Sequence, residues 1–152
     1  MGAAMLVHRA AVDEIGLMEE SFFMYGEEVD WQRRMQRAGW SVRFIPGAEV
    51  VHLGGGSSRE NWGRLYPVQV VNHVRYLALN EGLPTARRAR ALLLGALAWR
   101  SVLYRVAAFA PGGGAARRQR AEGFARARAQ LASVDPARLV SERHLPDWPP
   151  AL

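Results

Sequence analysis

The chain has 152 residues, of which 49% are hydrophobic, so it can form one domain with a core or a part of a larger one. It contains no cysteine, which excludes disulfides and thiolate metal sites. The net charge of +6 is uneven: residues 1–60 hold 6 arginines and 9 acidic groups, whereas residues 61–152 hold 14 arginines and 5 acidic groups. This split predicts an acidic working end and a basic end that faces phosphate, in lipid or in nucleic acid.

The first forty residues predict a strand, a short helix, a loop and a longer helix. The apolar run at 3–9 is typical of a buried strand, and the helical turns that follow end at Gly16. The longer helix is predicted from Glu27 to Ala38, because acidic residues in its first turn and arginines further along suit the helix dipole. Gly39 stands where a left-handed C-terminal cap is expected.

Two more strands are predicted next, at 41–45 and 48–52, separated by Pro46 and Gly47. A Gly/Ser-rich stretch at 53–60 predicts a flexible loop.

The remainder of the chain predicts helices. An apolar stripe between Val70 and Ala78 indicates a first helix that ends at 81–84. A second helix is predicted at about 84–110 and an arginine-rich third at about 115–132, with an irregular tail.

Three carboxylates, Glu27, Glu28 and Asp30, directly follow the aromatic run FFMY. A solvated helix N-terminus would explain them, since the helix dipole stabilises each by roughly 0.3–1 kcal/mol. Glu27 and Asp30 share one helix face, whereas Glu28 projects to another side. We therefore expect Asp30 to be structural, bonding Arg34 at i+4, or to bind an acceptor.

Residues 2–59 contain a series of motifs: Gly2, Met5–Leu6, Arg9, Gly16, Met18–Glu20, Phe22–Phe23, Tyr25–Trp31, Arg34, Gly39–Trp40, Pro46, His52 and Ser57. In order and spacing, these motifs resemble the second half of the catalytic domain of family 2 glycosyltransferases, above all the rhamnosyltransferase-like members. Beyond residue 60 the resemblance is weak.

The resemblance implies an α/β fold. Residues 1–59 would form the acceptor-side, C-terminal part of a GT-A (Rossmann-like) domain, without the nucleotide-binding half of that domain. A helical, arginine-rich extension covers residues 60–152. It also implies inverting sugar transfer from a nucleotide-sugar donor to a glycan or lipid-linked acceptor, in surface polysaccharide or cell-wall synthesis.

The resemblance also assigns roles to residues. Glu28 stands where the family has the Asp that acts as general base, with Glu27 and Asp30 in support. His52 matches a histidine that ligates a divalent cation, Mg²⁺ or Mn²⁺. The substrate-binding candidates are Tyr25, Trp31, Ser57 and Arg59.

Other functions stay open from the sequence. The family's Asp-x-Asp motif has no counterpart here. Its absence predicts a fragment, or a chain that works beside a separate nucleotide-binding chain, and it predicts no sugar transfer by these residues alone.

A non-catalytic remnant or scaffold is the main alternative. A nucleic-acid module at 87–128 is disfavoured, because no helix-turn-helix or zinc signature is present. The basic helices suit either peripheral contact with the inner face of the cell membrane, in the cytoplasm, or packing on the catalytic domain.

Overall fold

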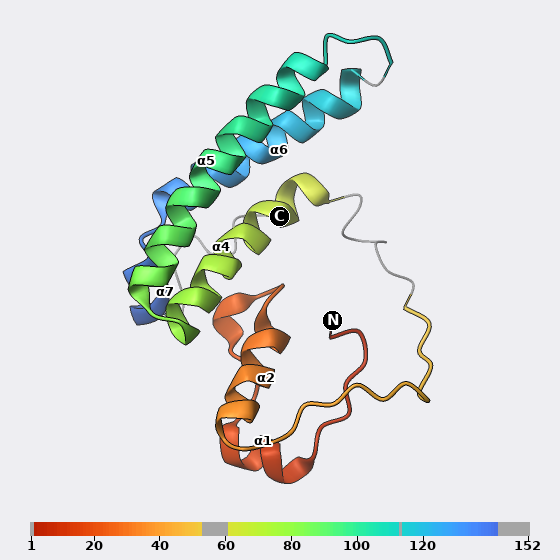
Figure 1. Cartoon of the computed structure of the whole chain (residues 1–152), viewed down its shortest axis with the longest axis vertical. Helices are drawn as coiled ribbons and strands as arrows, with labels where there is room; N and C mark the ends of the chain where they lie inside the picture. The colour runs from red at the N-terminus through yellow and green to blue at the C-terminus, as the bar shows by residue number, and fades with distance from the viewer. Residues whose placement is uncertain (1, 53–60, 113, 143–152) are drawn as a thin grey trace.

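The computed structural model describes residues 2–52, 61–112 and 114–142, and in these residues the regular structure is helical (Figure 1). The elements are α1 (Arg9–Ile15), the short 3-10 helix η1 (Glu20–Phe22), α2 (Glu27–Arg37), α4 (Trp62–Asn80), α5 (Leu83–Ala107), α6 (Gly114–Ser133) and α7 (Pro136–Ser141).

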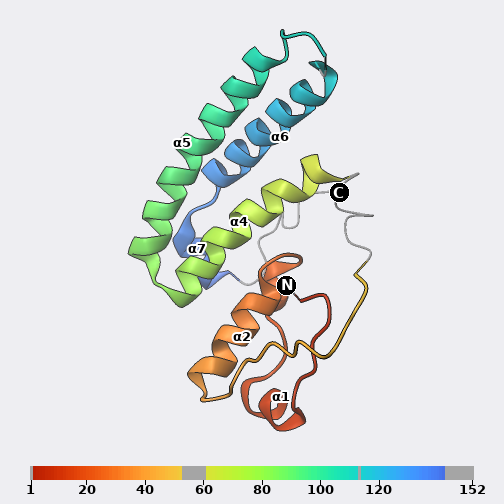
Figure 2. The same cartoon turned by 45° about the vertical axis from the view of Figure 1, so that its right-hand side comes forward.

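Helices α4 to α7 form a helical unit, and α1 and α2 lie on its α4 side (Figures 1 and 2). Helices α5 and α6 run side by side as a hairpin, and α4 packs along both of them. The short α7 packs on α4 and α5. Helix α4 is therefore the element that joins the hairpin to the N-terminal helices.

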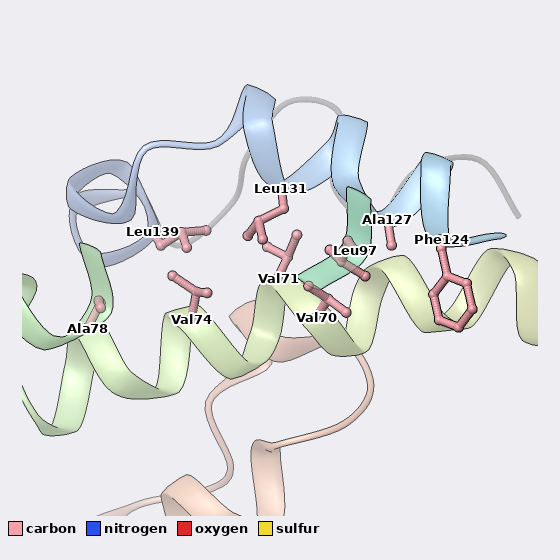
Figure 3. Packing of buried hydrophobic residues seen from close by; sticks show 10 residues of the cluster. Val70, Val71, Val74, Ala78, Leu97, Phe124, Ala127, Leu131 and Leu139 are labelled. Carbon is pink, nitrogen blue, oxygen red and sulfur yellow. The ribbon is translucent and has the colours of Figure 1, made fainter. Parts of the chain in front are cut away.

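The core of the helical unit is made by small and branched side chains that face one another from its four helices (Figure 3). Such side chains let helices approach closely while they fill the space between them. The buried members are Val70, Val71, Val74, Ala78, Ala86, Leu97, Phe124, Ala127, Leu131 and Leu139.

The predicted α/β fold is wrong for the described residues, because none of them forms a strand or a sheet. Residues 2–7 and 41–52 lie in loops, and the predicted turn between the second and third strands closes with Ala48 N–H donating to Ile45 O at 3.3 Å. A strand is stable only when a neighbour takes its backbone hydrogen bonds and covers its apolar face. Neither happens here: Leu6 is 96% and Phe44 90% exposed.

The helices lie where the sequence predicts them, because their end signals are local. Gly39, with φ 91°, follows α2, and Gly82, with φ 86°, separates α4 from α5. Both conformations are ones that glycine adopts at low cost. Helix α7 was not predicted; the Asp135 carboxylate accepts a hydrogen bond from Ala137 N–H at 2.9 Å and caps it.

An aromatic cluster ties α4 to α6 and depends on one glycine. The Trp62 ring stacks on Tyr66 at 4.9 Å between centroids and meets the Phe124 ring edge-on at 5.4 Å. Trp62 fits because Gly123 has no side chain: a Cβ at that position would lie 3.0 Å from Trp62 Cη2 and closer still to Cζ3.

We expect Gly123→Ala to lower the free energy of unfolding by about 1–3 kcal/mol, because the added methyl overpacks a ring that its neighbours hold in place. Gly95→Ala is the matched control. Gly95 also lies inside a helix, but nothing would meet its Cβ within 4 Å. This change should raise stability by about 0.5–1 kcal/mol. Chemical denaturation of both variants measures the difference; equal effects would show that the Trp62 contact does not constrain residue 123.

Candidate active site

The segment before α2 has an unusual backbone. Phe23 and Tyr25 have φ values of 58° and 70°, and Gly26 has φ 105°. Residues other than glycine rarely adopt positive φ values, and those that do concentrate at functional sites. The segment is fixed from outside: the Asn72 side-chain amide donates to Phe22 O and, at 2.7 Å, to Met24 O. The start of α2 is therefore held by α4 in a strained conformation.

Asp30 is the buried carboxylate of the cluster, with 4% of its surface exposed. Its Oδ2 accepts from Arg34 Nε at 2.9 Å, the i+4 bond that the sequence predicts. Its Oδ1 accepts from Asn80 Nδ2 at 2.8 Å. Both oxygens are thus used within the fold, as a buried charge requires.

The arginines after Asp30 extend this network. The two terminal nitrogens of Arg34 donate to Ile15 O at 2.9 Å and to Leu17 O at 2.8 Å, at the end of α1. Arg37 Nη1 donates to Asn80 Oδ1 at 3.0 Å. Arg34 and Arg37 therefore bond α2 to the elements on both sides of it, the end of α1 and α4.

Glu28 is not part of this network. Its side chain is half-buried, and it makes no hydrogen bond or ion pair within the described part of the chain. The backbone of Gly2 lies against its stem, where a Cβ would come within 2.8 Å of Glu28 Cγ. An unpaired, partly accessible carboxylate in the first turn of a helix is available to accept a proton from a ligand.

The other candidates of this region, Glu27, Trp31 and Tyr25, differ in burial and in hydrogen bonding. Glu27 Oε2 is buried and has no hydrogen-bond partner. Trp31 is 7% exposed, and its indole N–H donates to Gly16 O at 2.8 Å, so most of its ring belongs to the packing. Tyr25 is half-buried in the strained segment. Tyr25, Glu27 and Glu28 are the predicted site residues of this region that are half-buried rather than fully buried.

The predicted cation site has little support from the described residues. His52 is exposed, and no group of three His, Asp or Glu side chains that could hold a metal occurs in the described ranges. Ser57 and Arg59 lie outside the described residues. His8 has a structural role, since its Nδ1 accepts from Ala10 N–H at 3.2 Å and caps α1.

Arg75 is a feature that the sequence analysis missed. This α4 residue is fully buried, and Nε, Nη1 and Nη2 have no hydrogen-bond partner. Burial lowers the pKa of the Arg75 guanidinium below its ordinary value, and the negative charge of Glu19 partly opposes that shift. The side chain nevertheless stays charged, because arginine does not lose its proton in proteins.

Asn72 and Asn80, which hold α2 in place, were missed as well. A polar residue on a helix that also has an apolar stripe is normally expected to face solvent. Their spacing on α4, at three residues before and five after Arg75, gives no sign that they face another element. The roles of Asn72 and Asn80 become apparent only from their hydrogen-bond partners, at residues 22–24 and at Asp30.

Comparison with known proteins finds a relationship over part of the chain. A stretch of 51 residues is 43% identical to the N-acetylglucosaminyl-diphospho-decaprenol L-rhamnosyltransferase of Mycobacterium tuberculosis, in two strains. The match covers 34% of this chain and 17% of each relative. No family model and no solved structure matches the chain. The match relates this stretch to a glycosyltransferase.

We expect Arg75→Met to raise the free energy of unfolding by about 1 kcal/mol or more, because a buried, unpaired charge is replaced by an apolar chain of similar length. Arg34→Met is the matched control on the facing helix. Its three hydrogen bonds would be lost and Asp30 left without its ion pair, so stability should fall. Thermal unfolding of both variants decides the matter: a loss of stability in Arg75→Met would show that its guanidinium has a stabilising partner.

Proposed function

We propose that the chain carries the acceptor-activating part of a sugar transferase, with Glu28 as its general base. The observation that carries the proposal is the division of the carboxylates at α2. Asp30 is committed to the fold, whereas Glu28 is half-buried and unpaired. The strained backbone at Phe23 and Tyr25 beside it and the partial match to a rhamnosyltransferase support the same assignment.

In the proposed reaction the acceptor hydroxyl attacks the anomeric carbon of a nucleotide sugar. A new carbon–oxygen bond forms, the bond to the nucleoside diphosphate breaks, and the hydroxyl proton passes to the Glu28 carboxylate. A hydroxyl is a weak nucleophile near neutral pH, so a placed carboxylate contributes about 10²–10⁴ in rate. Asp30 positions Glu28 by fixing α2 against α4. Tyr25 would contact the acceptor.

The acceptor that we propose is lipid-linked, as the name of the mycobacterial relative states for that protein: N-acetylglucosaminyl-diphospho-decaprenol. The donor would be a nucleotide-activated sugar, and the reaction would take place at the cytoplasmic side of the membrane. A separate nucleotide-binding chain remains a predicted partner. A surface-polysaccharide or cell-wall product follows from the same proposal.

A divalent cation does not fit the described residues by themselves. Such an ion prefers several oxygen ligands, and His52 has no group of carboxylates with it in the residues described. His52 would contribute to one only together with further ligands.

The proposal is tested in a chimera in which the 51 matching residues of this chain replace those of the mycobacterial relative. Transfer of rhamnose to the lipid-linked acceptor would be measured. Glu28→Gln should lower turnover by about 10² or more, because the amide cannot take the proton. The unfolding temperature should change little, since Glu28 has no partner in the fold.

Glu27→Gln and Glu20→Gln are the controls, each of which removes one carboxylate from the same region. Both should retain most of the turnover. Near-normal transfer by Glu28→Gln would remove it from the role of base. A chimera that folds but never transfers, whatever stands at position 28, would favour a non-catalytic scaffold.

A further inference from the structure

Helix α5 is apolar on two opposite faces. Its buried residues, Ala86, Leu97 and Ser101, face α4 and α6, and the Ser101 hydroxyl donates to Ala121 O at 3.1 Å. Leu92, Trp99 and Val106 lie on the opposite side, seven residues apart and therefore on one line along the helix. They are 76%, 67% and 64% exposed. An apolar helix face is normally packed against another element.

The α5 outer face consists of Leu92, Gly95, Trp99, Val102, Leu103 and Val106. It is about 21 Å long by the rise of an α-helix, and it contains no charged residue. Helix α5 itself lies on the side of the helical unit away from α1 and α2 in both views (Figures 1 and 2). Phe109, 91% exposed, extends the α5 outer face toward the turn of the hairpin.

The surroundings of this face are strongly basic. Between Glu81 and Glu122 the chain has eight arginines and no acidic residue. Arg88 and Arg105, near the two ends of the face, are exposed, and no arginine of α5 forms an ion pair in the described part of the chain. Helix α5 therefore combines an apolar strip with positive charges that form no ion pair within the described residues.

We propose that the α5 outer face lies on an anionic lipid surface, in the plane of the membrane. Apolar side chains would enter the boundary between headgroups and acyl chains, with Trp99 at the depth that tryptophan prefers, while arginines contact lipid phosphates. None of the described helices combines the length and apolarity that crossing a bilayer requires. This inference does not depend on Glu28, so membrane binding can hold where sugar transfer fails.

The charge distribution favours lipid over a second copy of the chain. A symmetric contact through α5 would bring the arginines of one copy to those of the other. Residues 82–121 offer no carboxylate to separate them. Lipid phosphates would supply the negative charge that the arginines beside the α5 outer face need, and the membrane interior would take up its apolar side chains. A membrane that carries the acceptor would also bring it to the protein.

The test is flotation of the full chain with vesicles of phosphatidylcholine alone and of phosphatidylcholine with an equal part of phosphatidylglycerol. The wild type should float with the anionic vesicles, weakly with the neutral ones, and less as salt is raised. Leu92→Gln/Trp99→Gln/Val106→Gln should reduce binding roughly tenfold or more. The control Leu79→Gln/Val140→Gln changes exposed apolar residues of α4 and α7 and should bind like the wild type.

A second pair of variants tests the charges. Arg88→Gln/Arg105→Gln should weaken binding to anionic vesicles by roughly tenfold. Arg9→Gln/Arg126→Gln, which removes the same charge where arginines are paired with carboxylates, should have a smaller effect. Quenching of Trp99 by brominated lipid, with Trp99→Phe as the blank, provides a readout in a folded chain. Absence of wild-type flotation, equal binding by the triple variant, or a dimer that this variant disperses would each overturn the proposal.

Discussion

The buried carboxylate of Asp30 is the interaction on which the arrangement of the N-terminal elements depends. It bonds Arg34 on its own helix and Asn80 at the end of α4. Arg34 in turn bonds the carbonyls that follow α1. One charged group thus connects three segments, in a region where few apolar side chains are buried. A buried ion pair is strongly destabilising when one partner is removed, so this region is sensitive to a single residue.

This constraint also distinguishes two carboxylates of the cluster, Asp30 and Glu28. They begin the same helix, where the dipole favours negative charge. Asp30 lies on the face that meets α4 and is fully bonded, whereas Glu28 projects elsewhere and is left unpaired. Fixing α2 through Asp30 gives Glu28 a defined position without using its oxygens. A general base requires this combination of fixed placement and free oxygens.

The helices could be predicted from the sequence because their signals are local. Gly39 and Gly82 mark helix ends, and the i+4 spacing of Asp30 and Arg34 indicates their bond without knowledge of the fold. The strands at 3–9, 41–45 and 48–52 could not be judged in this way. Their apolar pattern indicates only that one face of the segment would have to be buried. Whether a strand forms depends on neighbouring strands, which a short stretch of sequence does not contain.

The candidate site shows the same limit. The proposed role of Glu28 rests on its motif, but the contacts that hold the start of its helix come from Asn72 and Asn80, more than forty residues later in the chain. Arg75 is hidden for a similar reason, since an arginine on a helix is normally exposed. Likewise, arginines distributed around α5 do not reveal that the part of one face between Leu92 and Val106 is apolar and exposed.

The most direct test of the central claim, that Asp30 fixes α2 against α4, is a double-mutant cycle. The free energies of unfolding of Asp30→Ala, Asn80→Ala and the double variant would be compared with the wild type. The account predicts a coupling energy of about 1–3 kcal/mol, because the hydrogen bond is buried and one partner is charged. The exposed pair Arg9 and Asp13 is the control, with an expected coupling below about 0.5 kcal/mol. A coupling between Asp30 and Asn80 as small as the control's would contradict the account.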